Sequence, residues 1–438
     1  MKTSLDCEAS WELQKGKRNT EYNLLGVFDL VWNRRSAGLI PQQIAFGILS
    51  VLLPIYVIEE IGGNLWDVGF ISAMKSFVQI PAVVFWARWI DKKARCKIFL
   101  LISFLVSGLM IFTFTLAKDV WSFLGLNVVL SIFYVAQAPA IRVLIAESCP
   151  RPEWETELAQ HRFVLGISGI VGLLAGALWM IRGDNPSLML LCGVLVLVSL
   201  TLSAVLIHDP RLMIERKIAR FERFVHLAGQ AYNLAYSPTS YTRAQNWKMY
   251  FTRYPNPKHL ILGIFFFPMA SSMVLTTIPI FLSVKIGVSS SLIFSIVLVE
   301  SIMILIGYTL IRKHRQTEDL KIIEMASVLC LFVPILLLVS GLLPFPLALT
   351  VTSTALAIAG FTWPYFSVPS TVLWMETAPR GTGGMYNACV TLGTALGSLM
   401  GGLVPLHYGY QTLFILSTTV SGMSLFFFII STRMNPHL

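Results

Sequence analysis

The chain has 438 residues, of which 55% are hydrophobic and 13% charged, with a mean hydropathy of +0.70 and a net charge of +10. Soluble domains carry roughly 25% charged residues, so this composition excludes one water-soluble core and indicates a polytopic membrane protein. The apolar runs are continuous rather than alternating over segments of about 10 residues, which predicts membrane helices rather than a β-barrel.

The first 36 residues are polar and contain no apolar segment typical of a secretory signal. We interpret residues 1–36 as a cytoplasmic tail. The six cysteines of the chain show no C-x-x-C spacing. We therefore expect no disulfide framework, no metal site and no cofactor.

Twelve apolar runs follow, each near the ~20 residues needed to cross about 30 Å of hydrocarbon. The predicted spans are 37–58, 66–87, 98–117, 120–141, 163–181 and 187–207, then 259–282, 290–311, 322–342, 345–371, 385–405 and 410–431. We predict an all-α polytopic membrane protein with twelve transmembrane helices in two pseudo-symmetric six-helix bundles. The bundles are 37–207 and 259–431, joined by a linker at 208–258 and followed by a tail at 432–438.

The positive charges predict the orientation. Of the 33 lysines and arginines, only Lys118, Arg182 and Lys285 fall in predicted outer loops when the N-terminus is inside. This asymmetry is the positive-inside pattern of integral membrane proteins. It places both termini in the cytoplasm and accounts for the net charge without a nucleic-acid partner.

The predicted linker is basic and amphipathic. Arg216, Arg220 and Arg223 alternate with apolar residues such as Ile218 and Phe221. This pattern is typical of a helix lying on the cytoplasmic membrane surface. It indicates either contact with anionic lipids or a plain connection between two bundles.

A short sequence repeat relates the two halves. Pro54 lies in Leu53-Pro54-Ile55-Tyr56, and Pro279 lies 225 residues later in Ile278-Pro279-Ile280-Phe281. Each proline is followed by a glycine, Gly62 and Gly287, at the same spacing. A repeat at half the chain length is typical of transporters built from two related halves.

The turn after the second predicted span contains Asp91, Lys92, Arg95 and Lys97. This acidic and basic pattern resembles the signature loop of the major facilitator superfamily, although alanine stands at 87 and 94, where the family usually has glycine. The resemblance covers essentially the whole chain. It implies two six-helix bundles around a central cavity that opens alternately to the two sides of the membrane.

The same resemblance implies a cytoplasmic latch of paired charges that breaks when that side opens. Glu147 and Pro150 follow the fourth span, and Glu376 and Pro379 follow the tenth with the same spacing. A plain positively charged loop remains the alternative interpretation. The predicted latch residues are Arg88, Asp91, Lys92, Arg95, Glu147, Arg162, Arg312, Arg315, Glu376 and Arg380.

Two ionisable residues fall near the middle of predicted spans, Lys75 in the second and Glu300 in the eighth. They lie 225 residues apart, so they occupy equivalent positions in the two halves. A charge at this depth costs roughly 2.5–3.5 kcal/mol on insertion scales, which favours a functional role. We expect Lys75 to recruit an anionic group and Glu300 to bind a proton or a cationic group. A direct ion pair and local snorkelling are the alternatives.

Weaker candidates come from polar and aromatic residues of the spans. Gln42 and Gln43 begin the first span, where polar groups can face a cavity. Arg142, near the end of the fourth span, is either an anchor for an anion or a further latch residue. Trp363 and Tyr365 flank Pro364, which we expect to interrupt the tenth span and to line either an apolar pocket or the lipid.

Glycines recur at about four-residue spacing in the fifth and eleventh spans, which predicts close helix packing or a sliding contact. They are Gly166, Gly169, Gly172, Gly176, Gly393, Gly397, Gly401 and Gly402. The fifth span lacks the Gly-Pro pair found in the antiporters of the resembling family.

The function predicted from these features is secondary active transport of a small organic solute across the cell membrane, with proton coupling through Glu300 as a sub-hypothesis. The solute is either an anionic or zwitterionic metabolite or a lipophilic compound that is exported. A membrane receptor or scaffold on a transporter fold remains an alternative. An enzyme is disfavoured, because the seven histidines are unclustered and no catalytic motif is present.

Overall fold

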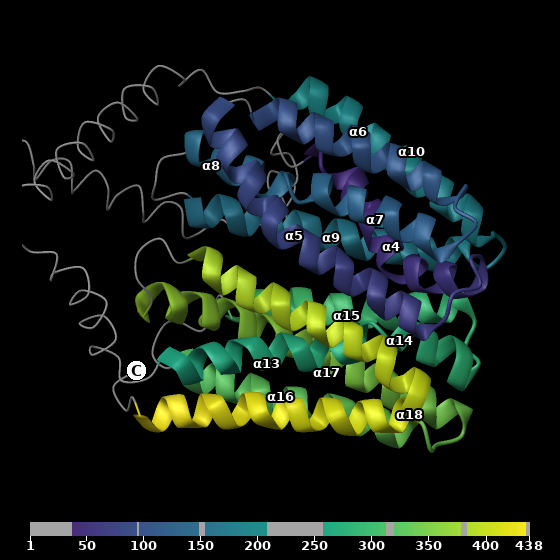
Figure 1. Ribbon diagram of the computed structural model, residues 1–438, viewed down its shortest axis with the longest axis vertical. Coiled ribbons are helices and arrows are strands. Elements are labelled where there is room, and N and C mark those ends of the chain that lie inside the picture. Colours follow the sequence, from purple (N-terminus) through teal and green to yellow (C-terminus); the bar gives the residue numbers. More distant parts are fainter. Residues whose placement is uncertain are drawn as a thin grey trace, which may run out of the picture.

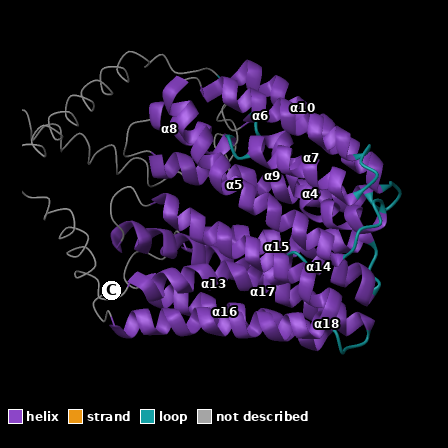
Figure 2. Ribbon diagram, viewed as in Figure 1, coloured by secondary structure: helices purple, strands orange, loops and turns teal. Residues whose placement is uncertain are grey.

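The computed structural model describes residues 37–93, 96–148, 154–207, 257–311, 319–377 and 383–434 (Figure 1). Within these ranges every regular element is a helix (Figure 2). The predicted all-α fold class is therefore confirmed. The tail 1–36, most of the linker 208–258 and the last four residues lie outside the described part of the chain.

The helices form two groups that lie on opposite sides of the molecule (Figure 1). The first half contains α4 (Ile40–Glu59), α5 (Leu65–Lys93), α6 (Cys96–Phe114), α7 (Val120–Tyr134), α8 (Gln137–Ser148), α9 (Trp154–Trp179) and α10 (Asn185–Leu206). The second half contains α13 (Pro257–Leu275), α14 (Ile278–Ile280), η2 (Phe281–Ile286), α15 (Ser290–Ile311), α16 (Asp319–Ser340), α17 (Phe345–Thr377) and α18 (Gly383–Met434).

The described residues provide eleven helices that are long and apolar enough to span a membrane, against the twelve predicted. The difference arises in α18, which has 52 residues and contains Gly409 with a non-helical backbone (φ 82°, ψ 165°). Gly409 separates the predicted spans 385–405 and 410–431, so α18 has the length of two spans joined by a sharp bend. The protein is thus a multi-pass membrane protein.

The 225-residue repeat is visible in the backbone. Gly62 and Gly287 both adopt the left-handed conformation, with φ of 72° and 76°. Both end a helix, where glycine accepts a positive φ without strain. The helices that start at 65, 120 and 185 have counterparts that start at 290, 345 and, after the Gly409 bend, at 410.

Close packing inside each half follows the same register. A Cβ on Gly172 of α9 would overlap the carbonyl oxygen of Ile44 in α4. A Cβ on Gly397 of α18 would overlap the carbonyl oxygen of Met269 in α13. The two glycines are 225 residues apart, and so are their two partners. Helix approach of this kind needs glycine, which explains these two positions of the glycine ladders.

The fourth predicted span is broken. Helix α7 ends at Tyr134 and α8 begins at Gln137. Pro139 lacks an amide hydrogen, and a proline ring clashes with the carbonyl four residues earlier, here that of Val135. The break therefore lies where Pro139 requires it.

The expected interruption of the tenth span is wrong. Helix α17 continues through Pro364 and Pro369. Pro364 is the counterpart of Pro139, but its ring lies against Gly307 of α15, where an added Cβ would stand 3.0 Å from Pro364 Cγ. The absence of a side chain at Gly307 leaves room for the ring beside α15, and α17 stays helical through Pro364.

Aromatic residues lie near both ends of α5. Phe70 contacts Trp66 and Trp121 near one end, with ring centroids 5.4 and 6.2 Å apart. Phe85 and Trp89 contact each other near the other end, 5.1 Å apart. The 23 residues from Trp66 to Trp89 span about 34 Å of helix, close to the thickness of a bilayer core. Aromatic belts at this spacing are typical of the two membrane–water interfaces.

Short polar motifs cap the helices at the end of the molecule that carries Gly62, called the Gly62 end below. Asp119 accepts hydrogen bonds from the amide and hydroxyl of Ser122, at 2.9 and 2.7 Å. Asp184 and Ser187 repeat this arrangement at the start of α10. These hydrogen bonds lower the pKa of both aspartates below the ordinary value of 3.8. Their contribution to stability is present at neutral pH and is lost as the pH falls through the lowered pKa.

The substitution Gly172→Ala should destabilise the protein, because its Cβ would overlap the backbone of α4. Overpacking of this kind costs about 1–3 kcal/mol, so we expect a lower thermal unfolding midpoint for the purified protein. Gly125→Ala is the matched control, since a Cβ there meets nothing within 4 Å and alanine favours helix. Equal midpoints for the two variants would contradict the packing role of Gly172.

Candidate functional site

The two halves meet along two seams. Along the first, a Cβ on Gly69 of α5 would lie 2.6 Å from the Cα of Gly402 in α18. Along the second, a Cβ on Gly176 of α9 would lie 2.6 Å from the ring of Phe294 in α15. Phe294 is the 225-residue counterpart of Gly69. The two seams are therefore related by the same register as the halves.

Hydrophobic packing differs between the two ends of the molecule. A large core that includes Phe123 and Phe281 crosses both halves toward the Gly62 end. At the opposite end, where α10 ends and α13 begins, each half has a core of its own. Trp86 belongs to the core of the first half and Phe366 to that of the second. Among the described residues, the hydrophobic core that is shared by the two halves thus lies toward the Gly62 end.

Lys75 and Glu300 lie at the same depth in the two halves. Each is ten residues from the start of its helix, α5 or α15, which corresponds to about 15 Å or half of a bilayer core. Both side chains are half-buried. Neither forms a hydrogen bond or an ion pair with any described residue, and their helices belong to different seams. The direct ion pair considered from the sequence is therefore not formed.

One face of α4 is open to the space between the halves. Helix α4 packs against α9 and α10 of its own half and against α14 and α15 of the other. Ser50, in the middle of α4, is nevertheless exposed. Gln43 and Phe46 lie on the same helical face, at i, i+3 and i+7 with Ser50, and are half-buried. This face is therefore only partly covered by the other described helices.

An aromatic pair lies on this face. The ring of Phe46 stacks on the ring of Tyr134 in α7, with centroids 4.5 Å apart and an interplanar angle of 27°. The Tyr134 hydroxyl forms no hydrogen bond with a described residue. Neither residue was predicted from the sequence. Pro139, which lies just after the end of α7 at Tyr134, was the sequence feature that could have pointed to this pair.

The two glutamines of the first span differ in their surroundings. Gln42 is buried, and its backbone amide donates to Ser199 Oγ of α10 at 2.7 Å. Gln42 thus belongs to the contact between α4 and α10, although its side-chain Nε2 lacks a partner among the described residues. Gln43 is on the open face of α4, and its Nε2 lies 4.0 Å from the position of a Cβ on Gly169.

Trp86 stabilises the break in the fourth span. The amide of Ala136 donates to Phe133 O rather than to Ile132 O, so the Ile132 carbonyl lacks its helical partner. Trp86 Nε1 of α5 donates to that carbonyl at 2.7 Å. An indole from a neighbouring helix thereby satisfies a backbone group that the membrane interior cannot.

Trp363 and Tyr365 pack within the second half. Trp363 lies 5.9 Å from Phe366, and Tyr365 lies 4.8 Å from Phe361, measured between ring centroids. Both contact the hydrophobic core of that half. Their predicted role in a pocket stays a prediction.

Most of the predicted latch cannot be placed. Arg88 and Arg162 have described side chains, and both are exposed. Asp91, Lys92, Glu147 and Glu376, like Arg142, have only their helical backbone described, in α5, α8 and α17. Arg95, Arg312, Arg315 and Arg380 lie outside the described residues.

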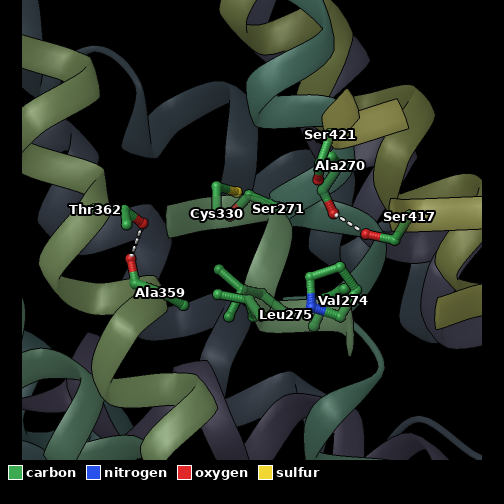
Figure 3. Close-up of a pocket in the computed structure, with 11 residues that line it drawn as sticks. Ala270, Ser271, Val274, Leu275, Cys330, Ala359, Thr362, Ser417 and Ser421 are labelled. Atoms are coloured by element: carbon green, nitrogen blue, oxygen red, sulfur yellow. Dashed lines mark hydrogen bonds between the residues drawn. The ribbon is translucent and has the colours of Figure 1, made fainter. Parts of the chain in front are cut away.

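A small cavity lies inside the second half, between α13, α16, α17 and α18 (Figure 3). Ser271 and Leu275 of α13 and Ala359 of α17 are half-buried, whereas Cys330 of α16 and Ser421 of α18 are buried. The enclosed part has room for about one water molecule. The cavity therefore fits one small group and not a whole organic solute.

The sequence model of the Major Facilitator Superfamily matches residues 36–385. The chain belongs to this superfamily. The match covers most of the chain and agrees with the two groups of helices and with the loop after α5. The resemblance found in the sequence is thus confirmed.

Known members of the superfamily resemble the chain in sequence or in fold. Multidrug resistance protein MdtG of Yersinia enterocolitica is 31% identical over 140 residues, and that of Escherichia fergusonii is 32% identical over 140 residues. Each match covers 31% of this chain, and the chain spans only 32% of the length of either relative.

Solved structures match over more of the chain. The nucleoside transporter NupG aligns with a TM-score of 0.67 at 14% identity, over 91% of this chain and 98% of its own. A bacterial homologue of the lysosomal transporter Spinster, in an inward-facing and unoccupied conformation, aligns with a TM-score of 0.63 at 13% identity, over 94% and 98%. At these identities the likeness shows the fold.

The substitution Trp86→Phe should destabilise the superfamily fold at the break of the fourth span. Phenylalanine keeps the aromatic contacts but removes the donor to Ile132 O, and an unpaired buried carbonyl costs about 1–3 kcal/mol. We expect a lower thermal unfolding midpoint in detergent. Trp121→Phe, at a residue that is 72% exposed, should leave the midpoint unchanged. A Trp86→Phe protein as stable as this control would show that the hydrogen bond does not matter.

Proposed function

We propose that the protein is a secondary active transporter that moves a small organic solute across the membrane by alternating access. The observation that carries this proposal is the pair Lys75 and Glu300. Each is half-buried at mid-depth and lacks a partner among the described residues. Because an unpaired charge is costly at this depth, it is expected where a solute or proton supplies the partner.

The two residues have separate roles in this proposal. Lys75 attracts an anionic group of the solute, and Glu300 exchanges a proton or binds a cationic group. Their helices lie on different seams between the halves, so a relative movement of the halves changes the surroundings of both. Such a movement couples the binding of solute to the binding of the proton.

The packing of the halves supports alternating access. A shared core joins the halves at the Gly62 end, while each half has its own core at the opposite end. This is the arrangement expected of a state that is closed at the Gly62 end. With the termini in the cytoplasm, as the positive charges predict, the state is closed outside and opens inward.

The cytoplasmic end carries the proposed latch. The charges from Arg88 to Arg95, with Glu147 and Arg162, are proposed to pair when that end closes, and Arg312, Arg315, Glu376 and Arg380 do the same in the other half. The basic linker 208–258 is proposed to rest on anionic lipids. These assignments are supported by the sequence pattern and by the family.

Export of lipophilic compounds is the second candidate. Its support is the printed name of the relatives, multidrug resistance protein MdtG, together with the stacked Phe46 and Tyr134 on the open face of α4. Aromatic side chains offer a lipophilic solute a large apolar contact area. The two candidates, export of lipophilic compounds and transport of an anionic or zwitterionic solute, differ in the class of compound that the purified protein binds.

A thermal-shift screen of lipophilic, anionic and zwitterionic compounds on the purified protein should identify the solute class, since a ligand of the folded state raises its melting temperature. In proteoliposomes, a pH gradient should accelerate transport of the identified solute. In Glu300→Gln the gradient should have no effect, while exchange of labelled for unlabelled solute continues, because only the proton site is removed.

Glu324→Gln is the matched control for this experiment. Glu324 also lies in a membrane helix, but its carboxylate accepts a hydrogen bond from Thr432 of α18. Its substitution should change stability and leave the response to the pH gradient intact. Unchanged coupling in Glu300→Gln would exclude Glu300 as the proton site, and binding without any exchange would favour a receptor over a transporter.

A further inference from the structure

The small cavity of the second half is bordered by residues whose counterparts in the first half include two aromatic residues. Its half-buried rim includes Ser271 and Ala359. In the 225-residue register, Ser271 corresponds to Phe46 and Ala359 to Tyr134. Phe46 and Tyr134 are the stacked aromatic pair of the first half. At these two positions the second half thus has a serine and an alanine where the first half has two aromatic rings.

The same register indicates which way the cavity opens. Leu275, the third rim residue, corresponds to Ser50. Ser50 is exposed on the face of α4 that borders the space between the halves. Because the halves are related by this register in their backbones, the rim of the cavity borders the same space from the opposite side. The cavity is thus a side pocket of the central passage.

Two of the buried hydroxyls around the cavity are already paired with backbone. Ser417 Oγ donates to Ala270 O at 3.0 Å, and Thr362 Oγ1 donates to Ala359 O at 2.8 Å (Figure 3). The first bond joins α18 to α13, and the second lies within α17. They leave the hydroxyl oxygens free to accept a further hydrogen bond.

The remaining polar groups of the pocket have weak hydrogen-bond partners or none. Ser421 is 3% exposed, and its Oγ has no hydrogen bond of ordinary geometry with a described residue. The Cys330 thiol lies beside Ser421 Oγ, and a thiol is only a weak hydrogen-bond partner. The Cys330 carbonyl also lacks its helical partner, because Pro334 has no amide hydrogen. No charged residue lines the pocket. An unpaired buried hydroxyl next to an empty space calls for a ligand group.

We propose that this pocket is a specificity subsite of the transporter, which takes one compact uncharged polar group of the solute, such as a hydroxyl. The rest of the solute lies in the central passage, against the aromatic face of Phe46 and Tyr134. The subsite rests on the proposed transport function. It deepens that function, because the two halves then offer the solute two different surfaces in equivalent positions.

Thiol labelling tests whether the pocket opens to the passage, independently of transport. The full chain is prepared with Cys330 as its only cysteine and treated in membrane vesicles with methyl methanethiosulfonate. The Cys330 thiolate attacks the divalent sulfur of the reagent, the bond from that sulfur to the sulfonyl sulfur breaks, a methyl disulfide forms on Cys330, and methanesulfinate leaves. Mass spectrometry measures the modified fraction. Cys192 is the control, because it corresponds to Ser417, a residue that lines the pocket, in the half that carries the aromatic pair.

We expect Cys330 to be modified at least about tenfold faster than Cys192 in the matching single-cysteine chain. Ser271→Phe with Ala359→Tyr reproduces the aromatic pair and should reduce the rate at Cys330 to that at Cys192. Phe46→Ser with Tyr134→Ala should conversely expose Cys192. A rate at Cys330 that the filling substitutions do not change would show access from the lipid and would overturn the proposal.

Transport provides the second part of the test. For a solute found by thermal shift, the parent protein should prefer the hydroxyl-bearing compound to its analogue with hydrogen in that place by about five- to tenfold, as expected for one neutral hydrogen bond. Ser421→Ala should abolish this preference, and the filled pocket should reject the compound. Ile302→Phe, on the exposed side of α15, adds similar bulk and should change nothing.

The outcomes separate the subsite from the transport function. A parent protein that binds and exchanges no solute overturns both proposals. A parent protein that transports, with the same preference in the filled variant and in Ser421→Ala, overturns the subsite alone. Stability is checked by the unfolding midpoint of each variant, and the reverse pair Phe46→Ser with Tyr134→Ala keeps the labelling test decisive if the filled variant does not fold.

Discussion

The need to satisfy backbone polar groups in a layer without water is the constraint on which the rest of this structure depends. Pro139 removes one donor from the fourth span, and the helix breaks at that point. The Ile132 carbonyl, left without its helical partner, accepts instead from Trp86 of α5. In the second half Pro364 has the same position, but α17 stays continuous, and the proline ring lies against Gly307 of α15. A proline at the same position thus has two outcomes: the helix of the first half breaks, and the helix of the second half continues.

The two halves of the protein share one register, whereas the side chains at their centres differ. Gly172 and Gly397 pack on equivalent carbonyls, and Gly62 and Gly287 share a rare backbone conformation. Within this common register, the aromatic pair of the first half corresponds to the rim of a cavity in the second half, and Lys75 of the first half corresponds to Glu300 of the second. Side chains at equivalent positions are free to diverge where they touch the passage, because they do not hold the helices together. The divergence is therefore where the chemistry of a solute would be recognised.

The sequence predicted the parts of the fold that depend on hydropathy and spacing. The spans, the family and the register that relates Lys75 to Glu300 all follow from those two properties. The break before Pro139 and the stack of Phe46 on Tyr134 did not follow, because they depend on which side chains meet across helices. The same holds for Pro364, which resembled a helix breaker although α17 continues through it. Gln42 is the opposite case. Its polarity suggested that it lines a cavity, but it is buried, and its backbone amide donates to Ser199 of α10.

The separation of Lys75 and Glu300 has a physical reason if the protein transports. Two opposite charges in contact at mid-depth would neutralise each other, and separating them in every cycle would cost several kcal/mol in a medium of low dielectric constant. Placed on α5 and α15, which belong to different seams, each charge instead lacks a partner within the described protein. Its desolvation is then offset only by what enters from the passage. A site of this kind favours the loaded transporter over the empty one, and the energy for moving the halves comes from binding rather than from breaking an internal ion pair.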